Sequence, residues 1–359
     1  MELDTRFALR KLLKNTKYHA SETSIPKEEL TAEKEPALRP KLAQIAEQIL
    51  AEPDTLLIDT YDLVERKKDW IALQKKIVVH DGVILAIDTR SRPGHKILDH
   101  HMSHFYSVAN HKGVSVRSLM TQEALEKALI TNVAMHSTPY RSEIRRMLTM
   151  TGGLSSVTKY RTVTAKAIVQ IFAARSVLDP CAGWGGRMLG ALAAGATYVG
   201  CEPDPNTARG LRAILADEAI PAAFSEHAKI IERPAEVAVS SQEKVDLVLT
   251  SPPYYNLELY TSGPQSVTNY PTWVEWSENW LRPLILTCLG RIHEGGTSCW
   301  SVKNFKSDKT YPLADFTKEV HKNAGWKLVR TVTMTGSGRM GAAKNSEEET
   351  FCFKKSSSI

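Results

Sequence analysis

The sequence lacks long hydrophobic runs. Its 359 residues contain no stretch of about 18 consecutive apolar residues, the length that a membrane-spanning helix needs. The first residues, MELDTRFALRKLLKNTKYH, have neither the uninterrupted apolar core nor the small-residue cleavage site of a signal peptide. We therefore expect a cytoplasmic protein with no membrane partner.

Cysteine is scarce as well. The chain has five cysteines, an odd number, and they are widely spaced and mostly lie inside apolar segments. This pattern favours buried free thiols over disulfides or a zinc site. The residues concerned are Cys181, Cys201, Cys288, Cys299 and Cys352.

Histidines gather in one place, the segment DHHMSH (99–104), with His95 and His111 nearby. Their spacing matches no standard metal-ligand pattern, so we interpret the segment as a partly exposed polar turn. No metal is predicted.

The composition is that of a folded protein with a sizeable core, because 42% of the residues are hydrophobic and 24% are charged. The charge is unevenly distributed. Between His101 and Ser176 there are ten basic and three acidic residues, whereas the rest of the chain is close to neutral. Such a window suits a polyanionic partner, although a solvated helical face would look similar.

From Ser176 onward, short apolar runs alternate with helical patterns, which predicts an α/β fold with a doubly wound, mostly parallel sheet of seven strands. The last two strands are separated only by TGSGRMGAAKNSEEE and should form an antiparallel hairpin. The predicted strands are 176–181, 197–203, 228–233, 244–251, 297–304, 327–334 and 350–355. The predicted helices are 185–195, 205–219, 272–293 and 312–325.

The first part of the chain predicts an α+β accessory region. Residues 21–41 have the composition of a loose linker, and 77–87 indicate a hairpin around Asp81-Gly82. Residues 119–136 have the pattern of an amphipathic helix. We therefore expect two domains, an accessory or target-recognition region at 1–150 and a catalytic domain at 151–359.

A glycine-rich turn, LDPCAGWGGRMLGA (178–191), joins the first strand of the predicted sheet to a helix. Such a turn lets backbone amides approach a ligand closely. Glu202 follows at the end of the next strand, where a carboxylate can bind both hydroxyls of a ribose. Pro234-Ala235, after the third strand, can hold an adenine. Together these strand ends predict a nucleoside site.

The turn has no spare glycines for a pyrophosphate, and Asp179 would repel phosphate while favouring a cationic ligand. S-adenosylmethionine has these properties, so we expect it as the cofactor. The residues expected to bind it are Asp179, Pro180, Cys181, Ala182, Gly183, Gly185, Glu202, Pro203, Pro234 and Ala235.

The segment TSPPY (250–254) lies about seventy residues after Asp179. With the glycine-rich turn, it resembles the catalytic motif of the S-adenosylmethionine-dependent DNA amino-methyltransferases of bacteria and phages, which is Asp, Asn or Ser followed by Pro-Pro and an aromatic residue. The resemblance covers about residues 155–355. It implies a Rossmann-like methyltransferase fold and a site-specific enzyme that methylates cytosine N4 or adenine N6 in double-stranded DNA.

The resemblance extends upstream to 152–172, which is similar to the family segment that contacts the methionine part of the cofactor. Lys159, Tyr160 and Thr164 are the candidates there.

The second motif also has a physical explanation. An exocyclic amine is a poor nucleophile. Ser251 Oγ and the Pro252 carbonyl can accept hydrogen bonds from its two N–H groups. Pro252 and Pro253 have no N–H and a fixed φ, so this corner is rigid. Tyr254 offers a face for a base that has left the duplex, and Tyr255 can do the same or cover the opening.

Several alternatives stay open. Target recognition has to come from the first 150 residues or from the loop 335–349, which contains Arg339 and Lys344. Serine in the first motif position leans towards cytosine N4, with adenine N6 nearly as favoured. An RNA base methyltransferase, for example one acting on guanine N2, and a non-catalytic nucleic-acid-binding subunit are the rival functions. A C5-cytosine enzyme is excluded, because the only Pro-Cys pair, Pro180-Cys181, lies in the cofactor loop.

Overall fold

The computed structural model describes residues 35–80, 84–88, 91–110, 112–135, 140–154, 158–261, 263, 265–335 and 349–356. Within these, the chain forms two units. One contains the described residues of 1–59 and 103–157, and the other contains those of 60–102 and 158–359. This division differs from the expected boundary at residue 150, because 60–102 packs with the large sheet.

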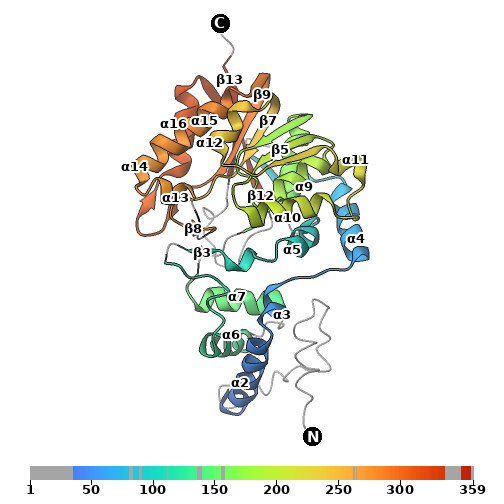
Figure 1. Ribbon diagram of the computed structural model, residues 1–359, viewed down its shortest axis with the longest axis vertical. Helices are drawn as coiled ribbons and strands as arrows, with labels where there is room; N and C mark the ends of the chain where they lie inside the picture. The colour runs from blue at the N-terminus through green and yellow to red at the C-terminus, as the bar shows by residue number, and fades with distance from the viewer. Residues whose placement is uncertain are drawn as a thin grey trace. The chain divides into compact units, whose positions relative to one another are not determined.

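The larger unit is built on a nine-stranded sheet in the order β1-β2-β12-β13-β9-β7-β4-β5-β6. Of these strands, Figure 1 labels β5, β7, β9, β12 and β13. Neighbouring strands from β9 to β6 are parallel, whereas β13 is antiparallel to both β9 and β12. The strands are β1 (Val79–His80), β2 (Ile84–Asp88), β4 (Ser176–Asp179), β5 (Thr197–Cys201), β6 (Ala228–Ile231), β7 (Val245–Thr250), β9 (Ile292–Val302), β12 (Trp326–Thr335) and β13 (Glu349–Lys355).

Seven of these strands were predicted, and their spatial order and final antiparallel hairpin are those of the Rossmann-like methyltransferase fold. The fold class is therefore confirmed. The predicted hairpin at 77–87 also exists as β1 and β2, with its turn at 81–83 outside the described residues. It does not belong to an accessory region, however, because β2 pairs in parallel with β12 and extends the sheet.

The helices of this unit fall into two groups that pack among themselves, as Figure 1 shows. One group contains α4 (Leu63–Gln74), α5 (His95–His101), α8 (Thr162–Ile171), α9 (Gly186–Ala193), α10 (Pro205–Leu215) and α11 (Ala222–Ser225). The other contains α12 (Ala235–Ala238), η3 (Val239–Ser241), α13 (Ser266–Asn269), α14 (Trp273–Glu275), η4 (Trp276–Leu281), α15 (Arg282–Leu289) and α16 (Leu313–Asn323). Short strands β8 (Glu258–Leu259), β10 (Phe305–Lys306) and β11 (Thr310–Tyr311) complete the unit.

The predicted helix 272–293 forms as one helical segment from Trp273 to Leu289, but it is not a regular α-helix. A π-helical turn, η4, separates α14 from α15, and Pro283 stands at the start of α15. Proline has no N–H to donate along the helix, so the regular α-helical pattern is interrupted there. The turn directs Trp276 and Trp280 into the core, where both are buried.

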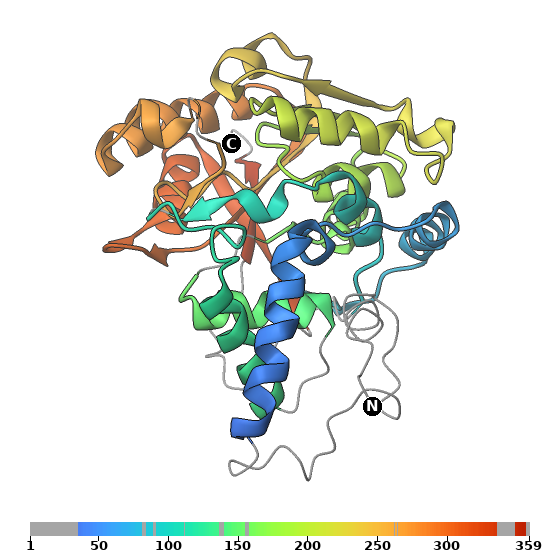
Figure 2. The same cartoon turned by 60° about the horizontal axis from the view of Figure 1, so that its bottom comes forward.

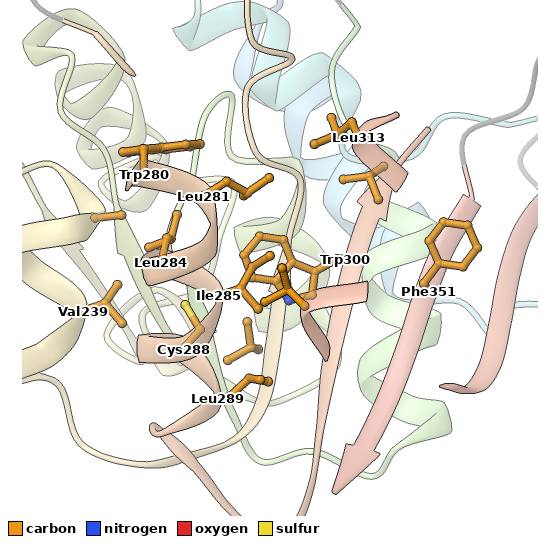
Figure 3. Packing of buried hydrophobic residues seen from close by; sticks show 14 of the residues in the cluster. Val239, Trp280, Leu281, Leu284, Ile285, Cys288, Leu289, Trp300, Leu313 and Phe351 are labelled. Carbon is orange, nitrogen blue, oxygen red and sulfur yellow. The ribbon is translucent and has the colours of Figure 1, made fainter. Parts of the chain in front are cut away.

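The main hydrophobic core lies between this helical segment and the sheet. Figure 3 shows Leu281, Ile285 and Cys288 packed towards Trp300 on β9. All five cysteines are free thiols, and all except the partly buried Cys181 are fully buried, as predicted.

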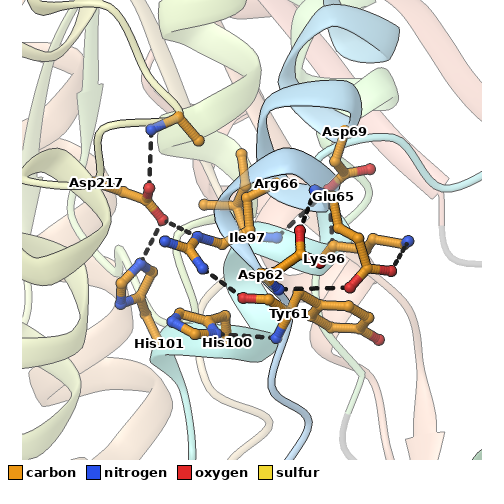
Figure 4. A network of polar contacts seen from close by, with 11 residues as sticks. Tyr61, Asp62, Glu65, Arg66, Asp69, Lys96, Ile97, His100, His101 and Asp217 are labelled. Carbon is orange, nitrogen blue, oxygen red and sulfur yellow. Dashed lines mark hydrogen bonds and ion pairs between the residues drawn. The ribbon is translucent and has the colours of Figure 1, made fainter. Parts of the chain in front are cut away.

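Polar contacts fasten residues 60–102 to the same unit (Figure 4). The buried carboxylate of Asp217 accepts a hydrogen bond from Arg66 Nε at 2.7 Å, and His101 Nε2 lies 2.7 Å from the same oxygen. His100 Nδ1 accepts from the backbone N–H of Tyr61. The segment DHHMSH therefore begins within α5 rather than in a polar turn. Among the described residues, which do not include His111, no group of His, Cys, Asp or Glu is placed to hold a metal ion.

The smaller unit is helical. It contains α2 (Glu35–Ala51), which Figure 2 shows as one long helix, with α3 (Pro53–Leu57), η2 (Phe105–Ser107), β3 (Ala109–Asn110), α6 (Gln122–Ala134) and α7 (Arg141–Thr151). Leu42, Ile49, Leu125 and Leu148 belong to its core. The predicted helix at 119–136 is confirmed. The predicted linker 21–41 is wrong from residue 35 onward, where α2 begins, and residues 21–34 lie outside the described residues.

Much of the basic window is used inside the protein. The guanidinium groups of Arg141 and Arg145 bind the buried carboxylate of Asp59 at 2.8 and 2.7 Å. Lys166 Nζ is buried and donates to the carbonyls of Leu73 and Lys75. Three more basic residues form ion pairs, namely Arg117 with Asp54, Arg146 with Glu143 and Lys159 with Asp99. The positive charge available to a polyanion is therefore smaller than the sequence indicates.

In the part of the chain that the structure describes, no helix is long and apolar enough to cross a membrane.

Gly190 provides a test of the packing between α8 and α9. A Cβ at this position would lie 2.5 Å from both Ala165 Cβ and the carbonyl oxygen of Thr162. We expect Gly190→Ala to lower the free energy of unfolding by about 1–3 kcal/mol, because the two helices must move apart. Urea denaturation measures the change.

The matched control is Gly290→Ala at the end of α15, where φ is −68° and the nearest atom to a new Cβ lies at 3.4 Å. This variant should keep or slightly raise the stability. Equal stabilities for the two variants would contradict the close packing of α8 on α9.

Candidate active site

A cavity of about 520 Å³ lies where the parallel strands end. Four segments that directly follow β4, β5, β6 and β7 line it, and these are residues 180–184, 202–205, 234–236 and 251–254. In open α/β sheets, ligands bind in the crevice at the carboxyl ends of the strands. The structure thus brings the glycine loop, Glu202, Pro234-Ala235 and the Ser-Pro-Pro-Tyr segment to one pocket.

The glycines of the loop have different tasks. The N–H of Gly183 donates to Glu202 Oε2 at 3.0 Å, and Gly183 lines the cavity. Gly185 has a φ of 82° and does not line the cavity, and a Cβ there would lie 2.9 Å from Leu211. Its role is to form the turn. At Gly186 a Cβ would lie 2.2 Å from the carbonyl oxygen of Tyr160, so the loop and the upstream segment meet backbone to backbone.

Asp179 does not face the cavity. Its carboxylate is fully buried and accepts four hydrogen bonds, from the Thr250 hydroxyl (2.8 Å), the Tyr198 hydroxyl (2.8 Å), Arg187 Nε (2.7 Å) and the backbone N–H of Cys181 (3.1 Å). A carboxylate offers about four acceptor positions, and all are used here. The prediction that Asp179 contacts a cationic ligand directly is therefore wrong. Asp179 instead joins β4 to β5, β7 and α9 beside the site.

Glu202 does face the cavity. Its two oxygens accept the backbone N–H groups of Gly183 and Asp204, each at 3.0 Å. The side chain is nearly buried, and this burial raises the pKa of Glu202 to about 7. Pro203 also lines the pocket, as do Pro180, Cys181 and Ala182 of the loop.

The upstream segment contributes Tyr160, together with Thr158, which the sequence did not single out. The Tyr160 hydroxyl accepts a hydrogen bond from Ser301 Oγ at 3.0 Å. The other two predicted residues do not line the cavity. Lys159 Nζ lies 2.6 Å from Asp99 Oδ1 in an ion pair, and Thr164 is buried in α8.

All four residues of Ser251–Tyr254 line the cavity. Tyr254 is held in place by its hydroxyl, which accepts the backbone N–H of Lys303 at 3.1 Å, and by an edge contact with Phe305 at 5.3 Å between ring centroids. Tyr255 has a φ of 24° and does not line the cavity. Its buried ring packs among Trp273, Trp276 and Tyr311. The prediction that Tyr255 stacks on a base or covers the opening is therefore wrong.

Sequence reasoning missed one wall of the pocket. Glu258 and Tyr260 stand two residues apart around β8 and line the cavity, and the Tyr260 hydroxyl donates to the Glu258 carboxylate. Residues two apart on a strand point to the same side, so the spacing of Glu258 and Tyr260 after the Ser-Pro-Pro-Tyr segment could have indicated that both face the pocket. Trp280 also lines the pocket, and its Nε1 donates to Glu236 Oε2 at 3.1 Å. No local pattern indicated it, because the π-helical turn sets its direction.

The charges around the cavity are mostly negative. Among the described residues, the carboxylates of Glu202, Asp204, Glu236 and Glu258 line it, against the single guanidinium of Arg187, which already binds Asp179. Such a pocket disfavours polyphosphates and favours ligands that carry positive charge or hydrogen-bond donors.

Comparison with known proteins adds little detail. No protein-family model and no curated protein matches this chain. Among solved structures, TrmN from Thermus thermophilus is similar with a TM-score of 0.37 and 16% identity, covering 55% of this chain and 49% of its own. Magnesium protoporphyrin IX methyltransferase from Synechocystis, with bound SAM, has a TM-score of 0.37 and 11% identity over 54% of this chain and 79% of its own.

Precorrin-6y C5,15-methyltransferase from Geobacter metallireducens has a TM-score of 0.38 and 13% identity over 57% of this chain and 95% of its own. This chain spans about half the length of the TrmN structure. Likenesses at this level do not identify a reaction, and the fold assignment above rests on the strand order.

The buried carboxylate of Asp179 predicts a large effect on stability. Asp179→Ala leaves the Arg187 guanidinium buried without its partner, which should lower the free energy of unfolding by about 3–5 kcal/mol. Chemical denaturation measures the loss.

The control is Glu278→Ala, which removes a carboxylate from an ion pair of similar length, 2.6 Å to Arg282, on the surface. It should cost about 0.5 kcal/mol or less. If the two variants were equally stable, the proposed structural role of Asp179 would be wrong.

Proposed function

We propose that this chain transfers a methyl group from S-adenosylmethionine to the exocyclic amine of a base in DNA, either cytosine N4 or adenine N6. The observation that carries the proposal is that Ser251–Tyr254 line the same cavity as the glycine loop and Glu202. A methyl donor on the loop and an amine on the Ser-Pro-Pro-Tyr segment would share one pocket.

The residues of the cavity fit this cofactor. Each Glu202 oxygen accepts one backbone N–H, and the remaining acceptor positions suit the two ribose hydroxyls. Pro203, Pro234 and Ala235 offer apolar surface for the adenine. The excess of carboxylates suits a ligand with positive charge. When bound, the cofactor supplies an electrophilic methyl group on a positively charged sulfur.

The chain's own residues supply positioning. The lone pair of an exocyclic amine is delocalised into the ring, so the nitrogen is planar and a poor nucleophile. Acceptors that bind both of its N–H groups favour the pyramidal form, in which the lone pair points towards the methyl group. Ser251 Oγ and the Pro252 carbonyl are such acceptors. The two prolines have no N–H and a restricted backbone, so these acceptors are fixed before substrate arrives. Tyr254, clamped by the Lys303 N–H, offers a ring edge or face to the base.

The base has to leave the DNA duplex to reach this pocket, at a cost of a few kcal/mol. Ser251 supports cytosine N4 slightly over adenine N6 through the family resemblance. Aromatic side chains around the cavity provide surfaces that offset the unstacking, and they are Tyr160, Trp184, Tyr254, Tyr260 and Trp280.

The function is tested with radiolabelled S-adenosylmethionine, using duplex DNA and total RNA in parallel. We expect label in DNA, and digestion to nucleosides should yield N4-methylcytosine or N6-methyladenine by mass spectrometry. Ser251→Ala should lower turnover by about 10²-fold while S-adenosylhomocysteine still binds with unchanged affinity. Label in RNA alone would end the DNA proposal, and a lack of S-adenosylhomocysteine binding would end the cofactor assignment.

Glu202 predicts a pH dependence of cofactor binding. Its pKa of about 7 means that the carboxylate is protonated below this pH and ionised above it. The ionised form accepts ribose hydroxyls more strongly. The Kd of S-adenosylhomocysteine should therefore fall as pH rises through about 7, by at most about tenfold per pH unit.

Calorimetric titrations on either side of that pH measure this dependence. The glutamine of Glu202→Gln cannot ionise. At high pH this variant should bind S-adenosylhomocysteine more weakly than the wild type, and its Kd should be nearly constant with pH. A wild-type Kd that does not change between these conditions would argue against Glu202 as the ribose ligand.

A further inference from the structure

A short hairpin, β10 and β11, adjoins the Ser-Pro-Pro-Tyr segment. Its buried rings, Phe305 and Tyr311, support Tyr254 and Tyr255, whereas its exposed side has no role in the site described above. Its two strands pair as Phe305 with Tyr311 and Lys306 with Thr310. The rings of Phe305 and Tyr311 are buried and stacked at 5.3 Å, whereas Lys306 is exposed. The hairpin thus has one face in the core and one face in solvent.

The exposed side carries positive charge. Lys303, Lys306 and Lys309 follow one another at intervals of three residues in KNFKSDK (303–309), and all three are exposed. Among the described residues, none of their ammonium groups takes part in an ion pair. Lys309 Nζ lies over the Tyr311 ring at 5.4 Å.

The one acidic residue of this segment, Asp308, binds neighbouring polar groups rather than the lysines. Asp308 accepts hydrogen bonds from Asn256 Nδ2 (2.9 Å), Ser307 Oγ (2.8 Å) and the Tyr311 hydroxyl (2.9 Å). These bonds, that from Asn256 first, lower the pKa of Asp308. Its charge therefore serves to hold the hairpin together rather than to pair with the lysines.

The same contacts couple the hairpin to the catalytic segment. Asn256 follows Tyr255 directly, and besides donating to Asp308 it has its Oδ1 at 2.7 Å from Ser307 Oγ. The backbone N–H of Lys303 donates to the Tyr254 hydroxyl at 3.1 Å. Two independent attachments therefore fix the lysines relative to Tyr254, which lines the cavity.

We infer that the β10–β11 hairpin contacts the DNA phosphate backbone through Lys303, Lys306 and Lys309 beside the nucleotide whose base enters the cavity. Exposed ammonium groups are general phosphate ligands, and phosphate contacts fix the register of a nucleic acid without reading its sequence. A backbone held by this hairpin would be held at a set position relative to Tyr254. The inference rests on the proposed function, since it takes DNA as the substrate.

The test is the salt dependence of binding to duplex DNA. The variant Lys303→Gln, Lys306→Gln, Lys309→Gln removes the three charges and keeps the backbone N–H that Tyr254 accepts. The slope of log Kobs against log salt is negative, and each lost phosphate contact lowers its magnitude by about 0.9. We therefore expect the slope of the variant to be less steep by up to about 2.7. Fluorescence anisotropy with labelled duplex at several salt concentrations measures it.

The matched control is Lys67→Gln, Lys68→Gln, Lys76→Gln, which removes the same charge from exposed lysines at α4 and just beyond it. Its slope should equal that of the wild type. Both variants should bind S-adenosylhomocysteine with unchanged affinity, which shows that the fold is intact.

The outcomes separate this inference from the proposed function. If the wild type methylates DNA but the hairpin variant keeps the wild-type slope, or the control loses as much, the hairpin is not the phosphate surface. If the salt dependence of DNA binding depends on the hairpin but the wild type transfers no methyl group, the hairpin is the phosphate-binding surface and the proposed reaction is wrong. Binding to RNA and not to DNA overturns both.

Discussion

The carboxylate of Asp179 is the point on which the site depends. It lies at the end of β4 and accepts hydrogen bonds from Tyr198 on β5, Thr250 on β7 and Arg187 on α9. These bonds join three adjacent parallel strands and the helix that follows β4 at fixed separations. A buried charge is stable only if its acceptor positions are satisfied, so none of these elements can shift without loss. The cavity is the space that this arrangement leaves at the carboxyl ends of the parallel strands.

Rigidity and polarity in the pocket come from different residues. The glycine loop and the two prolines fix the backbone, whereas Glu202 and Glu258 set the electrostatic character. Glu202 shows how the two are linked, because the N–H of Gly183 both orients the loop and stabilises the carboxylate. Outside the pocket, hydrogen bonds attach the β10–β11 hairpin to Tyr254 and Asn256, so the hairpin is held at a set position relative to the cavity.

The fold was largely predictable, and the part of the site at the strand ends was as well. Alternating apolar and helical patterns after Ser176 predicted seven strands and a final antiparallel hairpin, and all of them form. Hydrophobic periodicity is local and strong in buried parallel strands, which is why these elements could be predicted. The pairing of β2 with β12 was not predictable, because the two segments are far apart in sequence and neither carries a pairing signal. The π-helical turn at Trp276 was also missed, since the apolar pattern of 272–293 fits an ordinary helix.

The sequence by itself determined which residue types stand at the carboxyl ends of the strands, and thereby the chemistry available to the pocket. It could not decide which side chains face that pocket. Lys159 and Asp179 were expected to meet the ligand, yet each binds another charge of the protein, because burial makes an unpaired charge too costly. Glu258, Tyr260 and Trp280 reach the cavity only through the packing of segments after β7. Side-chain direction follows from the balance of burial and pairing across distant segments, and only the tertiary structure sets that balance.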